Sequence, residues 1–104
     1  MSTARGFDRT PIHADRVRSI DGSFAFVPHR LLRDGFWASL HRDELLLYLL
    51  LVLVADRQGM SFYADDRLAS IMRLVLDDFL HARTALVHKD LVAYAPAGHR
   101  YQVL

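Results

Sequence analysis

Residues 68–92 have the sequence LASIMRLVLDDFLHARTALVHKDLV, and this stretch decides the fold class. Apolar residues at its start follow one helix face, which predicts a brief helix capped by Asp65 and ending near Arg73. Apolar residues then return at the i, i+3 and i+7 spacing of a second helix, which runs to Lys89. The positions expected to face the core are Leu68, Ala69, Ile71 and Met72 in the first helix and Phe79, Ala82 and Leu86 in the second.

A longer helix is predicted upstream, over residues 42–57, with Gly59 as its C-terminal stop. Ser39 or His41 is the candidate capping residue, because Glu44 lies three residues after His41. Eleven consecutive residues in this helix are apolar, fewer than the about 20 of a membrane span, so we expect a buried helix. A small domain cannot cover every side of such a helix. Either the N-terminal segment or a dimer interface would cover the remaining side, and a homodimer through this helix is favoured.

Four short β-type runs are also present, at residues 24–27, 61–64, 91–94 and 100–104. The first stops at Pro28 and predicts an edge strand, and the last two form a hairpin around a loop of turn-forming residues. Trp37 either plugs the base of the core or anchors a partner, and the core is favoured. The remaining residues predicted to build the core are Leu49 and Val52 of the long helix and Val92, Tyr94, Tyr101 and Val103 of the hairpin.

The composition indicates a single domain in a reducing compartment. The chain has 104 residues, of which 52% are hydrophobic, a formal net charge of +1 and no cysteine. The absence of cysteine excludes disulfides, and the first residues lack the apolar run of an export signal, so we expect a cytoplasmic protein. Residues 1–22 have no apolar period and predict a flexible arm, and residues 23–104 predict the folded domain.

The stretch that begins with Leu68-Ala69 and ends with the 86–92 sequence LVHKDLV resembles the winged helix-turn-helix superfamily of bacterial regulators and plasmid replication initiators. The resemblance covers residues 24–104. It implies an α+β domain, mainly α, with a three-helix core and a β-hairpin wing. It also implies binding of double-stranded DNA by a small bacterial transcriptional regulator, or by an accessory or replication protein of a mobile element.

The resemblance further implies which residues meet DNA. The helix that ends near Lys89 would enter the major groove, where its outward side chains face base edges. The candidates on this recognition helix are His81, Arg83, Thr84 and His88. The candidates for holding phosphates, some of them on the wing, are Arg67, Arg73, Lys89, His99 and Arg100.

The sequence departs from the family pattern in two places. Asp77 and Asp78 stand at the helix entry, where carboxylates repel phosphate, and they either cap the helix or accept hydrogen bonds from cytosine amino groups. The usual glycine of the turn is replaced by Arg73-Leu74-Val75. Together with the near-neutral charge, these departures leave an alternative function, a protein-interaction module on the same scaffold that does not bind DNA.

Catalysis is not expected. None of the six histidines forms an i, i+4 pair of the kind that binds zinc on a helix, so no metal site is predicted. The chain also lacks a nucleophile elbow and a glycine-rich phosphate loop. We therefore expect no enzyme activity, no cofactor, no small-molecule substrate and no membrane partner.

Overall fold

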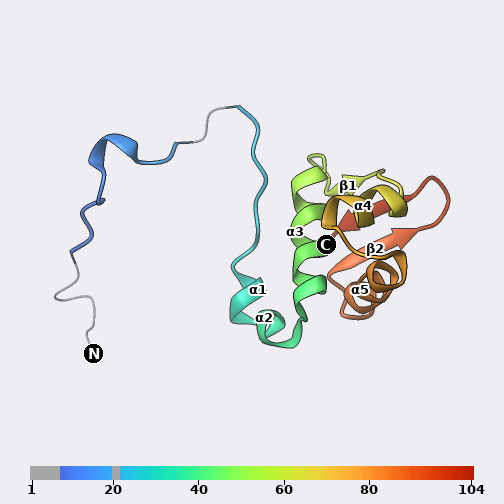
Figure 1. Ribbon diagram of the computed structural model, residues 1–104. Helices are drawn as coiled ribbons and strands as arrows, with labels where there is room; N and C mark the ends of the chain where they lie inside the picture. The colour runs from blue at the N-terminus through green and yellow to red at the C-terminus, as the bar shows by residue number, and fades with distance from the viewer. Residues whose placement is uncertain (1–7, 20–21) are drawn as a thin grey trace.

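The computed structural model describes residues 8–19 and 22–104. In chain order its elements are η1 (Ala14–Arg16), α1 (Arg30–Arg33), α2 (Phe36–Ser39), α3 (Arg42–Val54), β1 (Met60–Ser61), α4 (Asp65–Met72), α5 (Leu76–His88), β2 (Val92–Ala95) and β3 (Arg100–Val103). Figure 1 shows α3 between the N-terminal segment on one side and the sheet with α4 and α5 on the other. This arrangement confirms the predicted α+β class. Within the described ranges, no helix combines the length and the apolar character needed to cross a bilayer.

The sheet is antiparallel and has the order β1-β3-β2, so the C-terminal strand is the central one. β2 and β3 form the predicted hairpin, with Tyr94 opposite Tyr101. β1 pairs with the other edge of β3 and places Ser61 opposite Tyr101. Tyr101 therefore has a strand on both sides, is fully buried, and holds its ring centroid 4.6 Å from that of Tyr94.

The core lies where α3, α5 and the sheet meet, but α3 contributes only one side to it. The buried residues of α3 are Glu44, Leu47, Tyr48, Leu51 and Val52. Leu49 points away from this side and is 40% exposed, so its predicted place in the core is wrong. A helix that is apolar all round has no period from which its buried side can be identified.

The side of α4 that faces the core was predicted only in part. Leu68 and Ala69 are buried as expected, Met72 packs partly against the core, and Ile71 is 49% exposed. Successive helical positions turn by about 100°, so a helix that faces the core through Leu68 and Ala69 turns Ile71 toward solvent. The prediction that Ile71 packs inward is therefore wrong.

The start of α3 agrees with the prediction, and its end does not. The Glu44 carboxylate accepts a hydrogen bond of 3.3 Å from the His41 N–H, so His41, and not Ser39, precedes the helix. The helix ends at Val54 rather than at residue 57. The carboxylate of Asp56 then accepts hydrogen bonds of 2.9 Å from the N–H groups of Gln58 and Met60, which builds a turn into β1. Gly59 belongs to this turn and is not the helix stop.

The segment before α1 does not form the predicted strand. Among the described residues, 22–27 make no backbone hydrogen bond, and Phe24 and Phe26 are 66% and 72% exposed. A strand needs a neighbour for its N–H and C=O groups, and the sheet of β1, β3 and β2 does not include this segment. Of the predicted arm, residues 1–7 and 20–21 lie outside the described residues, and residues 8–19 and 22 are exposed.

The aromatic pair of α2 is divided between core and solvent. Phe36 packs against the buried cluster, whereas Trp37 is 53% exposed. The prediction that Trp37 plugs the core is wrong, because the helix turns the two neighbouring side chains in different directions.

The close approach of Gly59 to β3 generates a testable prediction. Gly59 has φ +81°, and a Cβ there would lie 2.8 Å from the carbonyl oxygen of Val103. Gly35 has φ +83° but nothing within 4 Å of the same position, so Gly35→Ala is a matched control. We expect Gly35→Ala to lower the free energy of unfolding by about 1–2 kcal/mol through backbone strain alone. Gly59→Ala should lower the free energy of unfolding by about 1–3 kcal/mol more than the control, because the added Cβ overpacks the contact with Val103. Urea unfolding measures both losses. Equal losses in the two variants would contradict the close approach.

Candidate nucleic-acid interface

One side of α5 is buried in the core and the other is exposed to solvent. Phe79, Ala82 and Leu86 are buried, as predicted from their spacing. The opposite side carries polar side chains at positions 77, 81, 84 and 88, and all of them are exposed. The hydroxyl of Thr84 donates a hydrogen bond of 2.9 Å to the Leu80 carbonyl oxygen one turn earlier. Three of the four predicted recognition-helix residues, His81, Thr84 and His88, thus share one open face.

The fourth residue, Arg83, is engaged inside the protein. Its guanidinium forms an ion pair of 2.6 Å with the carboxylate of Asp65 and lies 4.2 Å from the centre of the Tyr94 ring. The hydroxyl of Tyr101 donates a hydrogen bond to the same carboxylate. This Asp65 cluster, made of Asp65, Arg83, Tyr94 and Tyr101, fastens α4, α5 and the hairpin together. Asp65 does not cap α4 as predicted, because Ala64 is the capping position and no side chain caps the helix. The role of Arg83 as a base reader stays a prediction, and in this structure its guanidinium is held by Asp65.

Burial explains the protonation of the cluster. Burial raises the pKa of the Tyr101 phenol, and its hydrogen bond to the Asp65 carboxylate raises that pKa further. The neutral phenol is the form that can donate to a carboxylate, so the raised pKa extends the range in which the cluster stays intact above the ordinary pKa of tyrosine, about 10. Sequence spacing gave no signal for this contact, since 18 residues separate Asp65 from Arg83.

Lys89 is held in a similar way. Its ammonium donates hydrogen bonds of 2.7 Å to the Ser39 carbonyl oxygen and 3.1 Å to the Glu44 carboxylate. These bonds tie the end of α5 to α2 and to the start of α3. Two of the three ammonium donors are thus used within the protein, and the use of Lys89 as a phosphate ligand stays a prediction.

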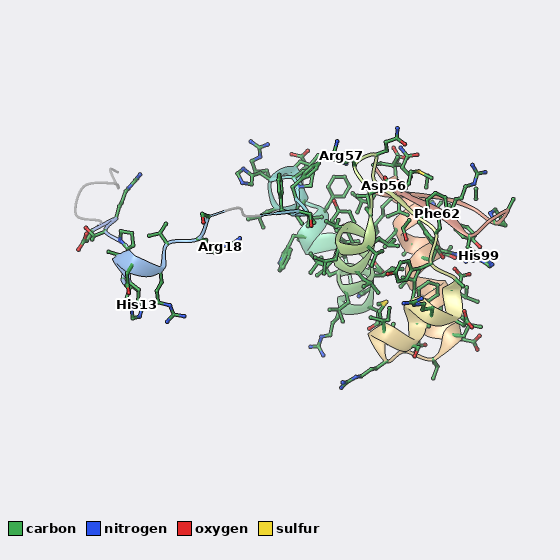
Figure 2. The ribbon with its side chains drawn as sticks, turned by 90° about the horizontal axis from the view of Figure 1, so that it is seen from above. His13, Arg18, Asp56, Arg57, Phe62 and His99 are labelled. Carbon is green, nitrogen blue, oxygen red and sulfur yellow. The ribbon has the colours of Figure 1, made fainter. Side chains whose placement is uncertain are left out.

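The other predicted phosphate ligands are exposed. Arg67 lies 4.7 Å over the Tyr63 ring, and Arg73 follows α4. Arg100 begins β3, and its Nε donates a hydrogen bond of 3.2 Å to the Ala97 carbonyl oxygen. His99 lies in the loop of the hairpin, away from α3 (Figure 2).

The turn between α4 and α5 closes without glycine. Arg73 itself adopts the left-handed conformation, with φ 59° and ψ 38°. Its N–H donates a hydrogen bond to the Ser70 carbonyl oxygen, and the Leu74 N–H donates one to Ala69. This is the bonding that a C-terminal glycine normally permits, so the sequence departure at Arg73 changes the residue and not the turn.

Acidic residues surround the open face. Asp77 and Asp78 lie in the first turn of α5, where Val75 is the capping position and no side chain caps the helix. Their carboxylates favour the helix through its dipole rather than through a cap hydrogen bond. The exposed charges near α4, α5 and the wing are Arg67, Arg73, Arg100, Asp66, Asp77, Asp78 and Asp90. With neutral histidines this face is close to neutral.

Comparison of the chain with protein-family models, with curated proteins and with solved structures gave no match. Among residues 8–19 and 22–104, no three histidine, cysteine, aspartate or glutamate side chains gather closely enough to hold a metal ion.

The Asp65 cluster predicts a specific loss of stability. Asp65→Ala leaves the half-buried Arg83 and the Tyr101 hydroxyl without their acceptor, and should lower the free energy of unfolding by about 1–3 kcal/mol. Asp66→Ala is the control, since Asp66 shares the first turn of α4 but is exposed. The control should lose less than about 1 kcal/mol in the same denaturant titration. Equal losses would show that the cluster adds nothing beyond a helix-end charge.

The raised pKa of Tyr101 predicts a loss of stability in alkali. Below about pH 10 the phenol is neutral in the folded and unfolded states, and its hydrogen bond contributes fully. Above that pH the unfolded chain releases the proton first, so the free energy of unfolding falls as pH rises. Tyr101→Phe cannot titrate, so its deficit relative to the wild type should shrink as pH rises from neutrality past 10, measured by urea unfolding. A deficit independent of pH would contradict the assignment.

Proposed function

We propose that the domain is a winged helix-turn-helix and that it binds double-stranded DNA by inserting α5 into the major groove. The element order supports this fold: α3, β1, α4, a tight turn, α5, and the hairpin of β2 and β3. In this proposal α4 and α5 are the helix-turn-helix and the hairpin loop of residues 96–99 is the wing. The activity is docking without chemistry.

The observation that carries the proposal is the division of α5 into a buried and an open face. An α-helix fits the major groove, and a helix that is fixed on one side presents the other as a rigid surface. His81, Thr84 and His88 occupy that surface and would meet base edges. Arg83 and Lys89 act in this proposal as positioning residues, because they fasten α5 to the rest of the domain.

Phosphate contacts in the proposal fall to the three exposed arginines, Arg67, Arg73 and Arg100, with His99 beside them on the wing. Each neutralised phosphate contributes about 0.9 to the slope of log affinity against log salt. Four exposed aspartates of α4, α5 and the turn after α5, namely Asp66, Asp77, Asp78 and Asp90, oppose these contacts. Binding to random DNA should therefore be weak, and most of the affinity for a specific site should come from base contacts.

This proposal is tested by fluorescence anisotropy of a labelled random-sequence duplex at a series of salt concentrations. We expect a slope of about −3 for the wild type, since three arginines at about 0.9 each set its size. The triple variant Arg67→Ala, Arg73→Ala, Arg100→Ala should lose most of that slope. A control triple variant at Arg33, Arg42 and Arg57, which are exposed outside α4, α5 and the wing, should keep it.

The alternative is a protein-interaction module, and two observations favour it. Trp37 exposes half of its surface, and Asp77 and Asp78 are exposed at the entry of α5. No binding at low salt, or equal weakening by both triple variants, would contradict the DNA proposal and support this alternative.

A further inference from the structure

A row of leucines on α3 faces away from the core. Leu46, Leu49 and Leu53 are separated by three and four residues and are 46%, 40% and 70% exposed. Their spacing places them on one face of the helix, opposite the buried residues, and no charged side chain lies between them. We call these three residues the leucine row. Single exposed apolar residues are normal on a protein surface, whereas a contiguous apolar row becomes an interaction site when further apolar area adjoins it.

An aromatic segment runs along the same helix. Residues 22–28 pass beside α3 on the side away from the sheet (Figure 1), and together with Val52, the turn after α3 and the end of β3 they line a groove of about 750 Å³. Phe24 and Phe26 border this groove and are mostly exposed. Among the described residues, 22–27 donate and accept no backbone hydrogen bond, so the segment is not fixed by its own domain.

We propose that a second copy of this chain covers α3. The leucine rows of two copies pack against each other across a twofold axis, and the aromatic segment of each copy closes over the α3 of its partner. A twofold interface uses the same patch on both subunits, and the leucine row is such a patch because it is apolar along its whole length. Antiparallel α3 helices also bring their opposite dipole ends together.

The required area explains why the aromatic segment takes part. A stable interface buries about 800 Å² on each partner, whereas three partly exposed leucines offer only a few hundred. Phe24 and Phe26, at their exposed fractions of 66% and 72%, add on the order of 100–150 Å² each. The row and the segment together approach the area of a stable dimer.

Residues 8–19 of the same chain are a poorer occupant. Residues 8–19 contain only Ile12 and Val17 as large apolar side chains, among several charged residues. His13 and Arg18 lie on this stretch away from the helices (Figure 2). A second copy instead supplies three leucines already arranged on a rigid helix.

The test is sedimentation equilibrium of the full chain from low to high micromolar concentration. The wild type should show twice the chain mass of 11.9 kDa. Leu49→Glu should raise the dimer dissociation constant by about 30-fold or more, because it places two carboxylates close to the twofold axis. Ile71→Glu is the matched control, since Ile71 on α4 is 49% exposed but lies outside the row, and this variant should remain dimeric. Circular dichroism confirms that both variants fold.

The double variant Phe24→Ser, Phe26→Ser tests the segment. It should weaken the dimer while leaving the unfolding midpoint of the dissociated chain unchanged. A wild type of 11.9 kDa at all concentrations, or a dimer that Leu49→Glu does not weaken, would overturn the proposal. A monomer that the double variant destabilises would instead place the segment on its own α3, which also overturns it. None of these outcomes depends on whether the protein binds DNA.

Discussion

Burial of one side of α3 is the constraint on which the rest of the structure depends. Leu47 and Leu51 are fully buried, and both α5 and the central strand of the sheet pack against this helix. The hydrophobic effect is the main favourable term in folding, and in a domain of this size the number of apolar side chains that can be covered is small. The chain concentrates apolar side chains on α3, and the sheet, α4 and α5 pack against that helix. This packing fixes the direction in which α5 faces.

Two basic side chains are used inside the domain. Arg83 and Lys89 neutralise Asp65 and Glu44, and in doing so they join elements far apart in the sequence. Half-buried ion pairs of this kind fix geometry more than they add stability, because desolvation offsets much of their attraction. These two pairs involve four of the 13 basic and 12 acidic residues, so the near-neutral net charge reflects mainly the balance of the other acidic and basic side chains.

Sequence reasoning was accurate where a local pattern determined the structure. The spacing of Phe79, Ala82 and Leu86 identified the buried side of α5, and the hairpin followed from two β-type runs around a turn. It failed where the outcome depended on distant partners. Because α3 is apolar on all sides, its sequence does not show which side is buried, and Leu49 was wrongly predicted to lie in the core. The acceptor of Arg83 lies on another helix, and no spacing rule connects the two, so the part of Arg83 in holding α5 in place was not predicted.

The division of α5 into two faces has a consequence for how this protein can change. Positions 81, 84 and 88 carry side chains that support no part of the core. Substitutions there are nearly free of folding constraints, whereas Arg83 and Lys89 are bound to the scaffold. Under the proposed function, recognition and stability can therefore diverge independently. A library that varies only the three outward positions would sample new binding preferences on an unchanged framework.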